Sequence, residues 1–235
     1  MVRDDCVVIF QPLGRTSGVL EPPIAKFKPD VIVIFTSQQS FADTAIEHTQ
    51  KTWVTHSRPA EVIVKIIEEP WNQDAIERYM KAFDDAVLEV NKSNEGKEIK
   101  RYVGTSGGTN LMAIASALSA FIYRYPVYSS LDAQHYAGEP AWELAIELKL
   151  FNNLGPAYKL LTGGENTLKI LKYISEHPGA TNKSLEYPFD CSNQYVSRIT
   201  KELKKCGLII SNSSCFTPTI LAKLLLSQLT DDDGS

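Results

Sequence analysis

The stretch that decides the fold is Ile99-Lys100-Arg101-Tyr102-Val103-Gly104-Thr105-Ser106-Gly107-Gly108-Thr109-Asn110. It begins with a run containing β-branched and aromatic residues, which predicts a strand. Glycines interleaved with hydroxyl and amide side chains follow, and they indicate a turn. The segment from Leu111 to Phe121 starts directly after the turn and is apolar on nearly every side, which predicts a buried helix.

Three earlier apolar runs predict further strands, at residues 6–10, 30–35 and 61–67. Between the third and the fourth strand, apolar residues recur at helical spacing from Ala75 to Val90. Strands that alternate with helices are typical of a parallel sheet covered on both faces. We therefore expect an α/β fold, with a Rossmann-like, mostly parallel sheet and helices on both of its faces.

Charge is distributed unevenly along the chain. The 235 residues carry 24 basic and 28 acidic side chains, a net charge of −4, whereas residues 165–230 carry eight basic and five acidic ones, a net charge of +3. This asymmetry indicates a nucleic-acid partner for the basic segment. The glycines of Thr162-Gly163-Gly164 give a flexible backbone where the net charge changes sign, so we expect a domain boundary there. The expected parts are a domain at 1–164, a small domain at 165–230 and an acidic tail at 231–235.

The composition disfavours several classes of protein. No apolar run is long enough to span a membrane, and the N-terminus lacks the basic start of a signal peptide, so we expect a cytoplasmic protein with no membrane partner. The four cysteines lie far apart, and the four histidines show no metal-ligand spacing. The sequence therefore predicts reduced cysteines, no metal ion and no cofactor.

Two glycine-rich loops are expected at the carboxyl edge of the sheet, where open parallel sheets bind ligands. One follows the first strand and the other follows the fourth. Glycines let backbone amides approach a ligand, and the following helix N-terminus favours an anion. The spacing fits neither a P-loop nor a dinucleotide fingerprint. A capped turn without a ligand is the alternative, but two such loops favour a phosphate-bearing ligand. The predicted ligand-binding residues, with two that follow the second strand, are Leu13, Gly14, Arg15, Thr16, Ser17, Gly18, Thr36, Ser37, Thr105, Ser106, Gly107, Gly108, Thr109 and Asn110.

The segment from Thr105 to Met112 resembles the T-G-G-T-K-x-M signature of CARF domains, the CRISPR-associated Rossmann folds that bind cyclic oligoadenylates. The segment from Pro12 to Gly18 resembles the second ligand-binding segment of that family. The resemblance implies a homodimer that binds one ring, expected to be cyclic tetra-adenylate, across its two-fold axis. Two residues depart from the pattern: Ser106 replaces the first glycine and Asn110 replaces the lysine. The missing cation weakens the attraction for phosphate, and Arg15 is a candidate replacement.

Residues 167–229 predict a winged helix-turn-helix domain. Thr181 and Ser192 are expected to cap its second and third helices, and the third helix is expected from Asn193 to Lys205. The string S-x-x-x-V-S-R-x-x-x-x-L-x-x-x-G-L-I resembles the winged helix of MarR- and ArsR-like regulators. The predicted DNA-binding residues on its polar face are Asn193, Gln194, Ser197, Arg198, Lys201 and Lys204. Because the expected wing carries no basic residue, a winged helix that serves only for dimerisation stays open.

The sequence thus predicts a CRISPR-associated regulator of antiviral defence, a homodimer that binds cyclic oligoadenylate and double-stranded DNA. In this prediction the ligand changes the spacing of the two recognition helices. The alternative is a metal-independent ring nuclease that uses attack by a ribose 2′-hydroxyl, with the catalytic candidates Ser17, Ser106 and Thr109. A regulator that senses another nucleotide or a metabolite is a further possibility. The sequence leaves open whether Trp53, Trp71 and Trp142 touch a ligand or pack within the fold, and packing is favoured because large aromatic residues are usually buried.

Overall fold

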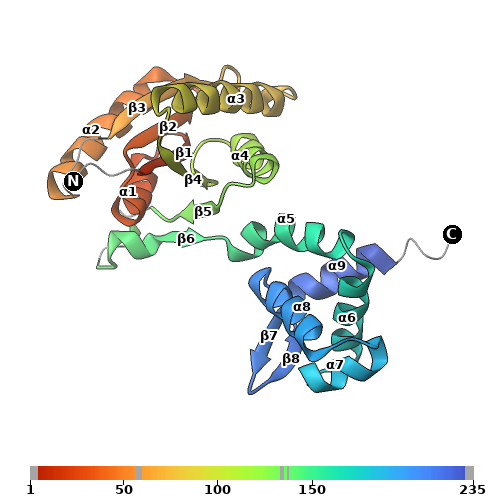
Figure 1. Cartoon of the computed structure of the whole chain (residues 1–235). Helices are drawn as coiled ribbons and strands as arrows, with labels where there is room; N and C mark the ends of the chain where they lie inside the picture. The colour runs from red at the N-terminus through yellow and green to blue at the C-terminus, as the bar shows by residue number, and fades with distance from the viewer. Residues whose placement is uncertain (1–4, 57–59, 133–134, 137, 231–235) are drawn as a thin grey trace. The chain divides into compact units, whose positions relative to one another are not determined.

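We describe the protein from a computed structural model, which covers residues 5–56, 60–132, 135–136 and 138–230. The expected acidic tail at 231–235 lies outside these residues. Packing divides the chain between Leu148 and Lys149 into two compact units, the first unit and the second unit. The first is coloured red to green in Figure 1 and the second is coloured teal to blue. No helix in the described part of the chain is long and apolar enough to cross a bilayer.

The first unit is built on a six-stranded sheet with the strand order β3-β2-β1-β4-β5-β6. Neighbouring strands from β3 to β5 are parallel, and β6 pairs with β5 in the antiparallel direction. The predicted Rossmann-like, mostly parallel sheet is therefore confirmed. The strands are β1 (Asp5–Leu13), β2 (Val31–Thr36), β3 (Glu61–Ile66), β4 (Glu98–Gly104), β5 (Val127–Ser130) and β6 (Ala145–Glu147).

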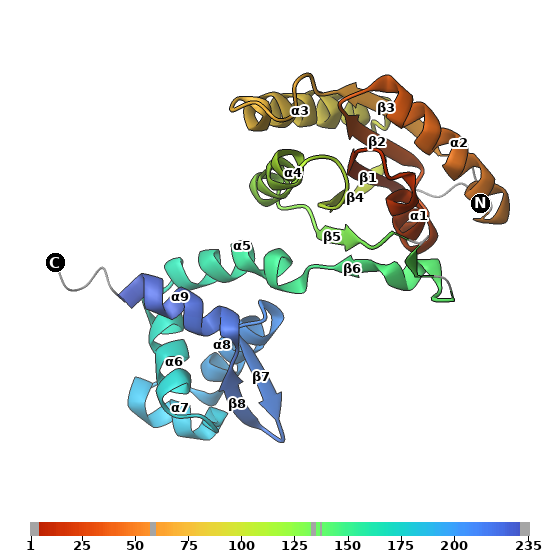
Figure 2. The ribbon, with the colours of Figure 1, turned by 180° about the vertical axis from the view of Figure 1, so that it is seen from behind.

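Helices cover both faces of this sheet, as the two opposite views show (Figures 1 and 2). On one face, Phe83 of α3 packs against Phe10 of β1, with ring centroids 4.7 Å apart. On the other face, Phe27 of α1 stacks on Tyr102 of β4 at 4.2 Å. Because β1 and β2 are covered on both sides, they read as continuous apolar runs. The helices of this unit are η1 (Ser17–Leu20), α1 (Glu21–Phe27), α2 (Gln39–His56), α3 (Ala75–Ser93), α4 (Asn110–Tyr123) and η3 (Ala141–Leu144).

The carboxyl ends of β1 and β4 open at the same edge of the sheet. These two strands stay paired up to Phe10 and Val103, after which β1 continues beside β2 to Leu13. β4 ends at Gly104, which pairs with Tyr128 of β5. Two connections therefore start close together at this edge, and we call residues 14–16 the β1 loop and residues 105–109 the β4 loop.

The second unit consists of helices and one antiparallel hairpin around a single core. The predicted caps are observed: the hydroxyl of Thr181 accepts a hydrogen bond from the amide of Ser184, and that of Ser192 accepts one from the amide of Tyr195. Leu171, Leu185 and Leu203 are among its fully buried side chains. The elements are α5 (Lys149–Thr162), α6 (Glu165–Glu176), α7 (Asn182–Phe189), α8 (Asn193–Lys205), β7 (Ile209–Asn212), β8 (Cys215–Pro218) and α9 (Ile220–Thr230).

Helix α5 belongs to the second unit, although the sequence predicts a boundary after it, at residue 164. Its residues Ala157 and Leu161 are buried in the core of the second unit. Gly163 does not act as a flexible linker, because its amide donates to the carbonyl oxygen of Lys159 at 3.0 Å. A glycine pair that signals loose backbone in the sequence is here a sharp turn between two packed helices.

Candidate functional site

The β1 loop and the β4 loop touch each other through their glycines. A Cβ atom added to Gly14 would lie 3.3 Å from the backbone nitrogen of Gly108. A Cβ atom added to Gly107 would lie 2.6 Å from the carbonyl oxygen of Pro12, and Gly107 has a φ of +89°. Position 107 therefore requires glycine. The structure thus brings together the two loops that the sequence assigned to one ligand.

A buried side-chain amide, that of Gln11, joins the end of β1 to the β4 loop. Its Nε2 donates to the carbonyl oxygen of Pro12 at 3.0 Å and to the carbonyl oxygen of Ser106. Its Oε1 accepts a hydrogen bond from the hydroxyl of Tyr128 at 2.7 Å. Gly104 makes room for this amide, since a Cβ atom there would lie 2.2 Å from Oε1 of Gln11. One fully buried side chain therefore bonds β1, the β4 loop and β5 together.

Sequence reasoning missed Gln11, although one signal was present. Gln11 continues the apolar run of β1 into the buried carboxyl end of the strand, and a polar side chain at such a position needs partners. Its partner Tyr128 is also fully buried, and burial raises the pKa of that tyrosine well above its ordinary value. The hydroxyl of Tyr128 consequently keeps its proton and stays a donor to Gln11.

Three hydroxyl groups of the β4 loop have structural partners. The hydroxyl of Thr105 donates to the carbonyl oxygen of Tyr128 at 3.1 Å, and that of Ser106 accepts from the amide of Ser130 at 2.7 Å. The hydroxyl of Thr109 accepts from the amide of Met112 at 3.3 Å and donates to the carbonyl oxygen of Pro70 at 3.0 Å. Thr109 is therefore the N-cap of α4, and Ser106 fastens the loop to β5.

The backbone amides of Gly107 and Gly108 are the candidate anion-binding groups of this site. Neither N–H group donates a hydrogen bond to any other residue that the structure describes. Both residues have positive φ, and Gly108 is exposed. They precede α4, whose first turn carries a partial positive charge because its amides lack partners within the helix. This arrangement suits an anionic group such as a phosphate.

The remaining predicted ligand-binding residues divide by exposure. Arg15, Thr16 and Asn110 are exposed, and Arg15 directly follows Gly14, the glycine that packs against Gly108. Leu13, Gly18 and Thr36 are buried, so they support the edge of the sheet rather than face solvent. Ser37 is half-buried, and Ser17 begins η1 with a side chain that lies outside the described residues.

A concave surface of about 700 Å³ lies in the second unit, between α7, α8 and the β7–β8 hairpin. We call it the basic groove. Four of the six residues predicted to bind DNA line it, namely Asn193, Ser197, Lys201 and Lys204. Arg198 does not line it, since its guanidinium lies over the ring of Tyr195 at 5.1 Å from the centroid. Gln194 is exposed and is not part of the lining.

The basic groove also contains residues that the sequence did not single out for binding. Lys183, at the start of α7, is not among the predicted DNA-binding residues, and Ser211 and Ser214 come from the hairpin. These residues lie in other elements than α8, so their convergence depends on how α7 and the hairpin pack against it. The groove joins three lysines with several hydroxyl and amide groups.

Comparison with known proteins shows the fold of the chain. No family model matches the sequence, and no curated protein matches it. Among solved structures, Csm6 from Enterococcus italicus bound to cyclic hexa-2′-fluoro-hexa-dAMP matches with a TM-score of 0.50 and 12% identity, over 88% of this chain and 56% of that chain. At this identity, the likeness to Csm6 shows the fold alone.

Two further solved structures are more distant. Can2 from Sulfobacillus thermosulfidooxidans in complex with cyclic tetra-adenylate matches with a TM-score of 0.40 and 16% identity, over 96% of this chain and 65% of that chain. Protein VC1899 from Vibrio cholerae matches with a TM-score of 0.40 and 11% identity, over 96% of this chain and 69% of that chain. The chain thus spans less than two thirds of the Csm6 and Can2 chains.

Replacing Gln11 by methionine tests the buried amide. The change keeps the size of the side chain but leaves the hydroxyl of Tyr128 and the carbonyl oxygen of Ser106 without their partner. We expect the free energy of unfolding of the first unit to fall by about 2–3 kcal/mol, measured by urea denaturation of the full chain.

Two further variants make that measurement specific. Gln38→Met, at an exposed glutamine after β2, should change the free energy of unfolding by less than about 0.5 kcal/mol. The double variant Gln11→Met/Tyr128→Phe should lose less than the sum of the two single losses, because it removes the unpaired hydroxyl as well. Equal stability of Gln11→Met and Gln38→Met would contradict the role of this amide.

Proposed function

We propose that the first unit is a CARF domain that binds a cyclic oligoadenylate, cyclic tetra-adenylate in particular, and that the chain is a regulator controlled by this ligand. The observation that carries the proposal is the contact of two glycine loops that leaves the amides of Gly107 and Gly108 without partners among the described residues. These amides directly precede α4, and the exposed residue Arg15 follows Gly14, which packs against Gly108. Backbone donors and a helix N-terminus are suited to the phosphates of such a ring.

The fold supports this ligand class. Csm6, which shares the fold, is bound in its solved structure to a ring of six modified adenosine nucleotides. The two loops of the present chain lie at the carboxyl edge of a parallel sheet, where sheets of this architecture bind nucleotides. A rigid pair of loops also favours binding, since less entropy is lost when a preorganised site accepts its ligand.

We infer that the ring is shared by two copies of the chain. Helix α4 begins at the β4 loop, and Ile114, Leu118, Phe121 and Ile122 leave an apolar stripe exposed along one of its faces. Such a stripe favours a protein partner over water. A second copy packed across this stripe with two-fold symmetry would bring both β4 loops toward one axis. The ring would then contact the glycine amides of both chains.

The ring-nuclease alternative draws no support from two of its three candidates, Ser106 and Thr109. Its candidates Ser106 and Thr109 have partners in the fold: Ser106 accepts from β5, and Thr109 both caps α4 and donates to Pro70. With its hydroxyl used in both directions, Thr109 has little freedom to orient a reacting phosphate. We therefore propose binding without cleavage.

We further propose that the second unit is a winged helix that binds double-stranded DNA through the basic groove. Lys183, Lys201 and Lys204 supply cations for phosphates. Asn193 and Ser197 supply groups that can reach base edges or phosphates. The hairpin contributes hydroxyl groups rather than cations to the groove, so the positive charge comes from α7 and α8.

Calorimetric titration of the full chain with cyclic tetra-adenylate, cyclic hexa-adenylate and linear tetra-adenylate tests the ligand. We expect one cyclic ring to bind per two chains, with weaker binding of the linear form and no linear product after incubation.

Arg15→Ala should weaken binding about tenfold, because it removes a charged hydrogen-bond donor. Lys81→Ala, at an exposed cation of α3, is the control and should bind as the wild type does. The proposal would be contradicted if neither ring binds. Linear products would favour the ring nuclease.

Salt dependence of DNA binding tests the basic groove. In Lys183→Gln and Lys201→Gln, affinity for a duplex of mixed sequence should fall, and the slope of log affinity against log salt should decrease by about one for each lost phosphate contact. Lys223→Gln, at an exposed lysine of α9 outside the groove, should leave the slope unchanged. The DNA proposal fails if the groove variants have the slope of the wild type.

A further inference from the structure

The connection between β3 and α3, residues 67–74, reaches the proposed ligand site. Its first residue, Ile67, donates its amide to the carbonyl oxygen of Thr36 at the end of β2, at 2.7 Å. Farther along, the carbonyl oxygen of Pro70 accepts the hydroxyl hydrogen of Thr109 at 3.0 Å. Thr109 directly follows Gly108, so this connection lies beside the glycine amides at the N-terminus of α4.

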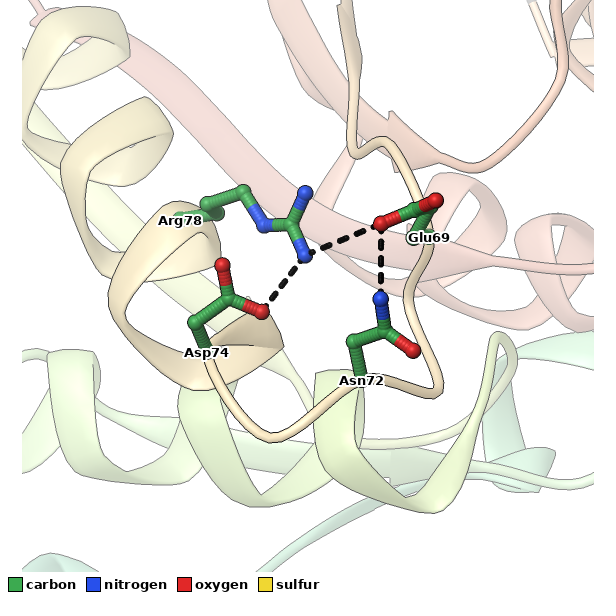
Figure 3. A network of polar contacts seen from close by, with 4 residues as sticks. All are labelled: Glu69, Asn72, Asp74 and Arg78. Atoms are coloured by element: carbon green, nitrogen blue, oxygen red, sulfur yellow. Dashed lines mark hydrogen bonds and ion pairs between the residues drawn. The ribbon is translucent and has the colours of Figure 1, made fainter.

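A polar network holds the connection in one shape (Figure 3). The guanidinium of Arg78 lies 2.6 Å from Oδ1 of Asp74 and 3.7 Å from Oε2 of Glu69. The side-chain amide of Asn72 donates to the same oxygen of Glu69 at 2.6 Å. The backbone amide of Asn72 also donates to the carbonyl oxygen of Glu69, which closes a turn around Pro70 and Trp71. Glu69 has a φ of +43°, an uncommon conformation for this residue type, and the network stabilises it.

The turn presents Trp71 to solvent. Its neighbour Pro70 is buried, whereas Trp71 is 68% exposed. Tryptophan is on average a highly buried residue. Exposing the indole of Trp71 on this turn leaves apolar surface in contact with water, and packing within the chain does not offset that cost. Packing within the fold, which the sequence favoured for Trp71, is therefore wrong, because most of this side chain is exposed. Its indole ring is a flat apolar surface one residue from the contact between Pro70 and Thr109.

We propose that Trp71 stacks on an adenine base of the ligand whose phosphate is held by the amides of Gly107 and Gly108. This inference rests on the proposed function and adds a base-recognition element to it. A nucleotide offers an anionic phosphate and a flat π-face. The site offers backbone donors next to Thr109 and an exposed indole next to Pro70, and a hydrogen bond joins Thr109 to Pro70. Because every base has a π-face, stacking on Trp71 adds affinity without selecting one base over another. The position of Trp71 relative to the glycine amides determines how far the stacked base lies from the bound phosphate.

Titration of the full chain with cyclic tetra-adenylate and cyclic hexa-adenylate tests the stacking. Trp71→Ala should weaken binding of the ring by about 5- to 150-fold, the range that corresponds to loss of one base–aromatic stack. Trp71→Phe keeps an aromatic face and should stay within about threefold of the wild type. Tyr187→Ala, at an exposed aromatic of the second unit, is the matched control and should bind unchanged. Because Trp71 is exposed, its variants should keep the melting temperature of the wild type.

Tryptophan fluorescence supplies a second readout on the unmutated chain. Ring binding should quench the emission of the wild type, and this quenching should be lost in Trp71→Phe while calorimetry still detects binding. If the wild type binds neither ring, the proposed function fails and the stacking fails with it. If the wild type binds a ring, but Trp71→Ala binds equally well or the quenching persists in Trp71→Phe, the stacking alone is overturned.

Discussion

The buried side-chain amide of Gln11 is the constraint on which the candidate site depends. It bonds Pro12, Ser106 and Tyr128, and so ties the end of β1 to the β4 loop and to β5. Hydrogen bonds in a dry interior are strong and costly to leave unmade, so the two loops are held together before any ligand arrives. The carbonyl oxygens of Pro12 and Ser106 are thus committed to the fold, whereas the amides of Gly107 and Gly108 have no partner among the described residues.

Features that depend on local signals could be predicted from the sequence. The apolar runs give the parallel strands, and the order of strand, glycine turn and buried helix gives the β4 loop and α4. The caps at Thr181 and Ser192 were predicted because cap residues act on amides two or three positions away.

Features that depend on tertiary packing could not be predicted. Gln11 reads as a polar residue at the end of a strand, and its role appears only when Tyr128, 117 residues away, packs beside it. Trp71 reads as a core aromatic, because nothing local shows that Pro70 docks on Thr109 and leaves the indole outside. Lys183 reads as an ordinary surface cation until α7 packs against α8. In each case the deciding contact comes from another element of the fold.

The most direct test of the account is a heteronuclear NMR titration of the full chain with cyclic tetra-adenylate, following the backbone amide resonances of Gly107 and Gly108. The account predicts that these resonances shift on addition of the ring, and more strongly than the amides of α3 away from the loops. Ring binding that leaves both glycine resonances in place would show that the anion is held elsewhere and would contradict the central claim.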